Sequence, residues 1–243
     1  MADVTPILST SGLKRHFGGL KAVDGIDFAL NAGEIRAIIG PNGAGKTTFV
    51  SLLSGRTAVT EGRIMFEGQE ITRIPAFKRV RLGIAYTFQI TNIYPNLSVM
   101  ENVRIAALGR AQRGDKLSTD VEARAILAAV GLADRAAHRA GEMAYGHQRL
   151  LEVAMGLALK PSILILDEPT QGLSDSEIDG FCALVKDIAR TSTVLLIEHN
   201  MDVVMRLADR ITVLNRGLKL AEGTPAQIRE NAEVQAAYLG TGS

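Results

Sequence analysis

Residues 40–47 have the residue types and spacing of a phosphate-binding loop. They read Gly-Pro-Asn-Gly-Ala-Gly-Lys-Thr and fit the pattern G-x-x-x-x-G-K-[ST] in full. Glycines let such a backbone curl so that successive N–H groups point at a polyphosphate, and a following helix adds its positive end. Lys46 would neutralise β- and γ-phosphates, and the Thr47 hydroxyl would bind Mg²⁺. The predicted nucleotide-binding residues are Gly40, Pro41, Asn42, Gly43, Ala44, Gly45, Lys46, Thr47 and Thr48.

Two carboxylates follow an apolar run further along the chain. Residues 163–166 read Ile-Leu-Ile-Leu, and Asp167 and Glu168 come directly after them. Ligands of open α/β sheets gather at the carboxyl ends of strands, so both acids are expected beside the phosphates. Asp167 suits Mg²⁺ ligation, directly or through water, and Glu168 suits a general base for an attacking water. The alternative is an acidic turn at a solvated strand end, which would be at least as good an interpretation without the phosphate-binding loop.

His199 follows a third apolar run, Thr193–Ile197, in the sequence Glu-His-Asn. A single histidine is more often a surface or core residue than a functional one. Taken alone, His199 is therefore a weak candidate for contact with a substrate.

Strands and helices must hold these candidate residues in place. Ile35–Ile39 predicts an apolar strand that runs into the loop, and residues 47–53 predict a helix that ends at Gly55. This context argues against a glycine-rich turn that matches the loop pattern by chance. Short β-rich runs alternate with helical patterns, which predicts an α/β fold with a largely parallel sheet. Further strands are expected at residues 63–67 (in a small antiparallel sheet), 84–88, 163–166 and 193–197, and as a hairpin at 211–214 and 218–221.

Residues 91–159 differ from the rest because they show almost no β pattern. Ser98 and Glu101 form a capping box, residues 122–130 are an alanine-rich helix pattern that ends at Gly131, and residues 149–159 are a third helical pattern. We expect an inserted helical subdomain at 91–159, with residues 1–90 and 160–243 completing one domain of residues 1–243. Two later helices are expected, one capped by Ser174 with Glu177 and a terminal one that starts at Thr224 and Pro225.

Composition narrows the class of protein. Apolar residues make up 47% and charged residues 22%, as in ordinary globular proteins. The net charge of +1 argues against a nucleic-acid binder, which needs surplus Lys and Arg. The single cysteine, Cys182, cannot form an internal disulfide and fits a reducing compartment. Residues 1–11 lack the features of a secretion signal and no apolar run approaches the roughly 18 residues of a membrane span, so we expect a soluble chain.

Beyond the loop and the acidic strand, the chain resembles the ATP-binding cassette (ABC) family over nearly its whole length. Residues 86–89 look like the family's Q-loop, residues 143–148 sit where its signature belongs, and residues 171–174 occupy the D-loop. His199 occupies the position of the family's switch histidine. Phe17 lies where the family keeps an aromatic that stacks on adenine, although a core or edge phenylalanine is an equally good interpretation. The resemblance implies the P-loop NTPase fold, with a RecA-like core and mainly parallel sheet, a small antiparallel β subdomain and an inserted helical subdomain.

The resemblance also implies roles for particular residues in an ATP hydrolase. The catalytic set would be Glu168, His199 and Gln89, and the ligands of Mg²⁺, bound with ATP, would be Thr47, Gln89 and Asp167. Gln89, at the start of the helical subdomain, would transmit the state of the γ-phosphate to a membrane partner. The signature would act on the nucleotide of a second subunit; its residues are Ala144, Tyr145, Gly146, His147 and Gln148.

The signature departs from the family pattern at two positions. Ala144 replaces the serine that contacts the γ-phosphate across the dimer, and His147 replaces a glutamine. A hydrogen bond to a charged group contributes roughly 1.5–3 kcal/mol, so its loss should weaken the two-subunit sandwich without abolishing it. Gly146 and the backbone N–H groups after it still offer an anion site.

Longer stretches of the chain look like ATPases of bacterial importers of branched-chain amino acids, a subgroup that also serves urea, short amides and other amino-acid-like solutes. The stretches are residues 17–23, 92–103, 198–204, 207–210, 221–225 and 234–240. The resemblance implies a second ATPase subunit, identical or paralogous, integral-membrane permease subunits and, indirectly, a solute-binding protein. It also implies a cytoplasmic chain, peripheral on the inner face of the cell membrane, with no nucleic-acid partner.

Three other functions remain open from the sequence. A soluble ABC ATPase that acts on nucleic acid or ribosomes commonly has two cassettes or a long coiled-coil insertion, and neither pattern is found here. A lipopolysaccharide-export ATPase fits residues 144–148 less well, and a P-loop kinase leaves the signature and His199 unexplained. We therefore expect a transporter subunit in which ATP binding closes, and hydrolysis reopens, a pair of subunits to drive solute import.

Overall fold

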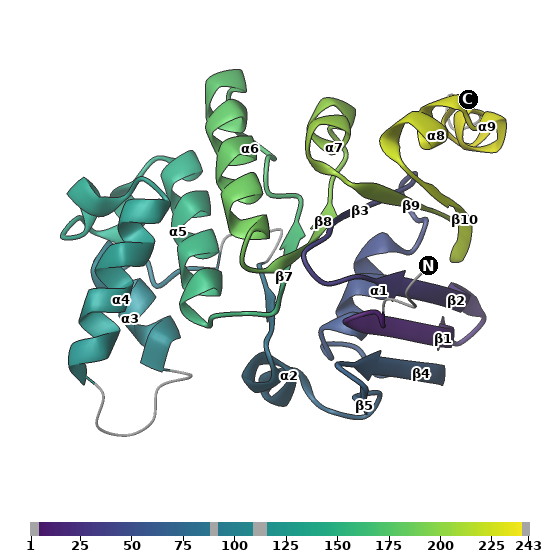
Figure 1. Ribbon diagram of the computed structural model, residues 1–243, viewed down its shortest axis with the longest axis horizontal. Coiled ribbons are helices and arrows are strands. Elements are labelled where there is room, and N and C mark those ends of the chain that lie inside the picture. The colour runs from purple at the N-terminus through teal and green to yellow at the C-terminus, as the bar shows by residue number, and fades with distance from the viewer. Residues whose placement is uncertain (1–4, 88–91, 109–115, 240–243) are drawn as a thin grey trace.

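A six-stranded sheet runs through the middle of the computed structural model, which describes residues 5–87, 92–108 and 116–239 (Figure 1). Its strand order is β10–β9–β3–β8–β7–β6. All pairs are parallel except β9 with β10. Every residue of the three central strands is buried, as a parallel sheet with both faces covered requires, and the predicted α/β fold is confirmed. The strands are β3 (Ile35–Ile39), β6 (Ile84–Tyr86), β7 (Ile163–Asp167), β8 (Thr193–Ile197), β9 (Arg210–Asn215) and β10 (Leu218–Gly223).

A second, four-stranded antiparallel sheet covers one face, with α1 (Lys46–Leu53) packed between the two sheets. Its order is β2–β1–β4–β5, formed by β1 (Leu8–Phe17), β2 (Leu20–Leu30), β4 (Glu61–Phe66) and β5 (Gln69–Glu70). The strand expected at residues 63–67 lies in β4, but β1 and β2 were not predicted. Shifts in register between Thr10 and Leu13 and again near Arg15 interrupt the alternation that identifies a strand.

The opposite face of the central sheet is covered by α6 (Asp175–Ala189) and α7 (Met201–Leu207) (Figure 1). The expected terminal helix is interrupted at Asn231, giving α8 (Pro225–Glu230) and α9 (Ala232–Leu239). The break occurs because the Asn231 side chain accepts a hydrogen bond from the amide of Val234, at 3.0 Å, and so caps a new helix.

Three helices pack on one another at the end of the molecule away from the four-stranded sheet (Figure 1). They are α3 (Val99–Leu108), α4 (Lys116–Ala129) and α5 (Tyr145–Ala158). Ser98 and Glu101 form the expected capping box. Helix α5 begins four residues before the expected start at Arg149. The proposed limits of a helical subdomain, residues 91 and 159, stay a prediction. Within the described ranges, no helix combines the length and apolarity needed to cross a bilayer.

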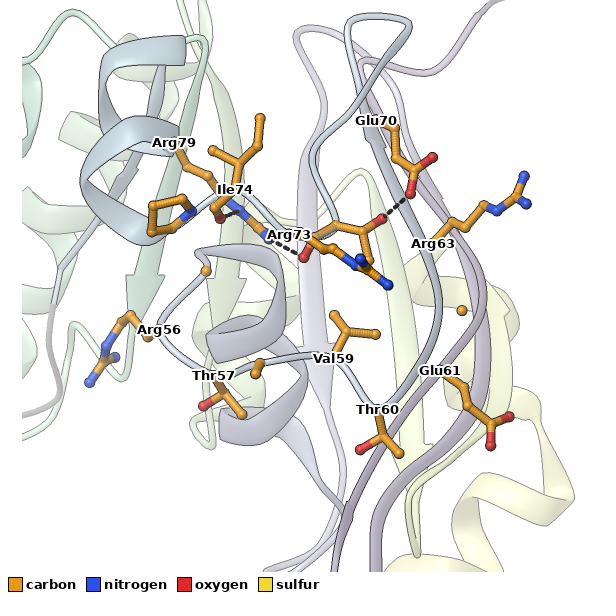
Figure 2. Close-up of a pocket in the computed structure, with 15 residues that line it drawn as sticks. Arg56, Thr57, Val59, Thr60, Glu61, Arg63, Glu70, Arg73, Ile74 and Arg79 are labelled. Carbon is orange, nitrogen blue, oxygen red and sulfur yellow. Dashed lines mark hydrogen bonds between the residues drawn. The ribbon is translucent and has the colours of Figure 1, made fainter.

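A buried arginine holds the C-terminal end of α1. Arg79, on α2 (Ala76–Leu82), donates from Nη1 to the carbonyls of Leu52 and Leu53 at 2.7 and 2.8 Å. Its Nε donates to the carbonyl of Ile74 at 2.8 Å (Figure 2). It lies at the edge of a cavity of about 960 Å³. Burial lowers the pKa of Arg79 to about 10, still well above neutral pH. The positive guanidinium therefore satisfies the unpaired carbonyls of the helix whose other end carries Lys46.

Candidate nucleotide-binding site

The loop between β3 and α1 borders a cavity of about 500 Å³. The cavity brings predicted residues from three parts of the chain together, because Glu168 and His199 line it with the loop. Its lining residues are Leu20, Lys21, Ala22, Asn42, Gly43, Ala44, Gly45, Lys46, Thr47, Thr48, Glu168, His199 and Arg216. Gly40 and Pro41, at the start of the loop, do not line this cavity, and their carbonyls accept hydrogen bonds from Lys46 Nζ at 2.7 and 3.1 Å.

Two loop glycines are required by close backbone contacts. Gly40 has φ +151° and Gly45 has φ +97°, conformations that side chains disfavour. A Cβ atom on Gly40 would lie 2.1 Å from the carbonyl oxygen of Leu214, and one on Gly45 would lie 2.3 Å from that of Ala22. These contacts fix the loop against the β9–β10 hairpin and the start of β2.

The β9–β10 turn is part of the site, although the sequence indicated only a turn. The Gly217 amide donates to the carbonyl of Ala44 at 3.0 Å, and the Asp24 amide donates to the carbonyl of Gly217 at 2.9 Å. Arg216 lines the cavity. No local pattern distinguishes this turn from any other hairpin, because its contact with the loop joins residues far apart in the chain.

The C-terminal helix α9 lies against the back of the loop. Ala236 and Ala237 share a small cavity of about 220 Å³ with residues 41–44 of the loop. The Tyr238 phenol is hydrogen-bonded to the backbone of Gly40, and burial raises the pKa of Tyr238 to about 12. The last helix of the described chain is thus in contact with the first residues of the phosphate-binding loop.

Asp167 ends β7 with one carboxylate oxygen satisfied and one not. The Tyr86 hydroxyl donates to Oδ2, whereas buried Oδ1 has no hydrogen-bond partner among the described residues. Burial raises the pKa of Asp167, and the nearby charge of Glu168 raises it further. A buried anionic oxygen costs free energy when it lacks a partner, and the described residues supply none to this atom.

Glu168 and His199 meet at the mouth of the cavity. Glu168 Oε1 and His199 Nε2 are 2.7 Å apart. Glu168 has φ +49°, a left-handed conformation that costs a residue with a side chain about 1–2 kcal/mol. Its amide donates to the carbonyl of Ile197 at 2.8 Å. The structure therefore brings together two predicted residues, Glu168 from the acidic strand and His199, in one hydrogen-bonded pair. Glu168 is held in a strained backbone conformation.

Glu198 is a site residue that the sequence analysis missed. It is buried, and its carboxylate accepts hydrogen bonds from the amides of His199, Asn200 and Thr170 at 2.8, 3.0 and 3.0 Å. It also accepts from the Thr170 hydroxyl. Glu198 thereby fixes the turn that carries His199 beside the segment that follows Glu168. Its position directly after a buried strand, as for Glu168, was the signal that could have found it.

Phe17 and Gln89 are the two predicted residues whose place in the site is not established by the described structure. Phe17 is 46% exposed at the end of β1, is absent from the residues that line the cavity, and has the Arg15 guanidinium 4.2 Å above its ring. Its stacking on adenine stays a prediction. Gln89 lies outside the described residues.

The signature residues 144–148 do not line the cavity of their own chain. Ala144 is the N-cap of α5, and Tyr145 to Gln148 form its first turn. Gly146 and His147 border a separate cavity of about 400 Å³ between α5 and α6. A Cβ on Gly146 would lie 2.3 Å from Glu177 Oε1, so a larger residue here would have to displace the Glu177 side chain.

Comparison with protein families decides the identity of this fold and site. A family model described as "ABC transporter" matches residues 23–171. The chain belongs to the ABC transporter family. A second model, described as "Branched-chain amino acid ATP-binding cassette transporter", matches residues 219–243 of this cassette. The predicted family and enzyme class, a transporter ATPase, are confirmed.

Similar proteins cover the cassette almost completely. The High-affinity branched-chain amino acid transport ATP-binding protein BraF of Pseudomonas aeruginosa is 39% identical, over 97% of this chain and 98% of its own length. The protein of the same description named LivG, from Escherichia coli K12, is 38% identical over 97% and 98%. A solved nucleotide-free ATP-binding cassette from an ABC transporter superposes with a TM-score of 0.88 at 27% identity, covering 96% of this chain and 98% of its own. The ADP conformation of the cassette MJ1267 gives 0.87 at 28% identity, with the same coverage.

Proposed function

We propose that this cassette binds and hydrolyses ATP to drive import of branched-chain amino acids or related small solutes such as urea and amides. The observation that carries the hydrolytic part is the Glu168–His199 hydrogen bond at the mouth of the phosphate-binding cavity. The names of BraF and LivG, which align end to end with the chain, support the class of solute. They give no support to an ATPase of nucleic acid, ribosomes or lipopolysaccharide export.

The residues act as follows. The loop amides and Lys46 bind the β- and γ-phosphates, and Lys46 exchanges the carbonyls of Gly40 and Pro41 for phosphate oxygens. Glu168 accepts the proton of the attacking water. His199, held by Glu198 through its amide, orients the Glu168 carboxylate through Nε2.

A magnesium ion fits the chemistry of the donor set. Oδ1 of Asp167 is a buried carboxylate oxygen with no partner in the described part of the chain, and Thr47 is exposed in the cavity. Oxygen ligands of this kind are those that Mg²⁺ prefers. Thr47, Asp167 and Gln89 would hold the ion, which neutralises charge on the phosphates when bound.

The partners are inferred from the groups that a complete site needs and that do not line the cavity of this chain. The signature residues do not line their own cavity, so a second ATPase subunit, identical or paralogous, completes each site with Ala144, Tyr145, Gly146, His147 and Gln148. Integral-membrane permease subunits and a solute-binding protein supply the route and the selectivity. The chain then works on the cytoplasmic face of the cell membrane and needs no nucleic acid.

Substitution of Lys46 tests the nucleotide chemistry. Lys46→Ala should weaken ATP binding at least about tenfold and abolish hydrolysis, because the loop loses its only side-chain charge. Isothermal titration and phosphate release measure the two effects. Lys186→Ala, an exposed lysine on α6, is the matched control and should change neither. Equal binding and hydrolysis in Lys46→Ala and the unaltered protein would refute the proposal.

Uptake experiments test the solute. Cells without this chain should lose import of labelled leucine, isoleucine and valine, and the unaltered chain should restore it whereas Lys46→Ala should not. Intact leucine uptake together with lost uptake of urea or acetamide would reassign the solute within the subgroup.

A further inference from the structure

Arg149 connects the signature helix to the end of the acidic strand. It lies on α5 directly after the signature residues and is 1% exposed. Its Nη2 donates to the carbonyls of Asp167 and Glu168 at 2.7 and 2.6 Å, and its Nε donates to the carbonyl of Pro169 at 3.3 Å. The carbonyls of three consecutive residues, the last of β7 and the two that follow it, therefore accept hydrogen bonds from one guanidinium, which only arginine can provide.

These carbonyls belong to the segment that aims the Glu168 side chain. Glu168 is in the left-handed region, with its amide bonded to Ile197 on one side and its carbonyl bonded to Arg149 on the other. The direction of its carboxylate toward His199 depends on this backbone conformation. A small displacement of Arg149 would consequently turn Glu168.

A buried acid ties Arg149 to a third segment. Nη1 of Arg149 is 2.8 Å from Glu152 Oε2, and the two side chains are 1% and 5% exposed. The other oxygen of Glu152 accepts from the amide of Asn92 at 3.4 Å. The ion pair thus joins α5, the end of β7 and the chain at residue 92.

We propose that Arg149 is a positioning residue that couples the signature helix of a subunit to the catalytic carboxylate of the same subunit. The coupling rests on the proposed function, in which Glu168 is the base and the signature binds the nucleotide of the second subunit. When the signature engages that nucleotide, the position of α5 sets the position of Asp167, Glu168 and Pro169. Closure of one site thereby prepares hydrolysis in the other.

Arg149→Lys in the purified full-length chain is the first test. Lysine keeps the charge beside Glu152 but cannot donate to three carbonyls in fixed geometry. We expect kcat for ATP to fall at least about tenfold while KM changes less than about threefold, because phosphate contacts are untouched. A double variant, Arg149→Met with Glu152→Gln, removes both charges so that neither is left buried and unpaired. This double variant should likewise lower kcat while leaving KM little changed.

The matched control is a similar buried pair elsewhere in the chain. Arg36 and Glu34 are 1% and 8% exposed, with Arg36 Nε 2.5 Å from Glu34 Oε1, and neither lines the nucleotide cavity. Arg36→Met with Glu34→Gln should keep kcat within about twofold, whatever its effect on thermal stability. Unchanged kcat in Arg149→Lys would overturn the proposal, as would equal loss of kcat in the control pair at equal stability.

A double-mutant cycle separates positioning from independent action. In a Glu168→Gln background, Arg149→Lys should lower single-turnover hydrolysis no further, because it acts through Glu168. A further loss by the same factor as in the unaltered protein would overturn the proposal. If Glu168→Gln alone left turnover intact, the assignment of the base would fail, and the inference with it. Loss in Glu168→Gln with none in Arg149→Lys would refute only the inference.

Discussion

At the scale of single residues, the site contains groups that are unfavourable for the isolated fold and useful for its chemistry. Asp167 is buried with one oxygen that no described residue satisfies. Burial lowers the pKa of Lys46, so both charged groups are disfavoured where they stand. Charged side chains whose charged form is disfavoured by burial are expected where the natural partner is a ligand.

Asp167→Asn should stabilise the nucleotide-free protein while abolishing Mg²⁺-dependent hydrolysis. The pKa of Asp167 is raised in the fold, so the folded state binds more protons than the unfolded state above the ordinary value near 4. This carboxyl therefore makes the free energy of unfolding fall as pH rises through that window, and the asparagine removes the effect. We expect a gain of roughly 1 kcal/mol near neutral pH, measured by urea unfolding.

The control for this change is Asp187→Asn, an exposed residue on α6. It should leave both stability and hydrolysis unchanged. A destabilised Asp167→Asn protein would mean that the ionised carboxylate is satisfied within the fold, contrary to the contacts described.

At the scale of elements, short-range patterns predicted the central strands and the caps well. Ile35–Ile39 and Thr193–Ile197 are strands with the predicted limits, because four apolar residues out of five suit a strand buried on both faces. The predictions failed where local pattern is weak. Strands β1 and β2 carry register shifts, and the roles of Glu198 and of the β9–β10 turn arise from contacts between distant segments. Sequence spacing carries no signal for the contacts of the β9–β10 turn, whereas the position of Glu198 directly after a buried strand was a signal that could have been used.

Helix α5 offers a prediction at this scale because its N-cap is an alanine. Ala144 has φ −55° and ψ 150° and makes no side-chain capping bond, unlike Asn200 and Thr224 at the starts of α7 and α8. Ala144→Ser should stabilise the fold by about 1 kcal/mol, as N-cap serines do, with ATPase activity equal or higher. Thermal unfolding and phosphate release are the measurements.

Ala183→Ser provides the comparison, since it places serine on an exposed position in the middle of α6 where no cap can form. It should not stabilise. A large loss of activity in Ala144→Ser would show that the alanine is specifically required in the signature.

At the scale of the whole molecule, one chain supplies a phosphate cradle and a carboxylate–histidine pair but holds its signature elsewhere. Gly146 and His147 border the cavity between α5 and α6 rather than the nucleotide cavity. On the proposed function, a second subunit supplies the signature that completes each site.

Glu168→Gln should retain ATP binding and accumulate as an ATP-bound dimer, because the nucleotide that joins the subunits is no longer removed. Sedimentation velocity with ATP and Mg²⁺ should show the dimer, and ADP should not produce it. Adding Lys46→Ala to the same chain should return it to monomer. Undiminished turnover in Glu168→Gln would transfer the role of base to another residue.

The contact between α9 and the phosphate-binding loop has a practical consequence for anyone who purifies this cassette. Ala236 and Ala237 share a small cavity with residues 41–44 of the loop. Preparations truncated before Ala232 lose α9 and with it this contact, so they should bind ATP less tightly.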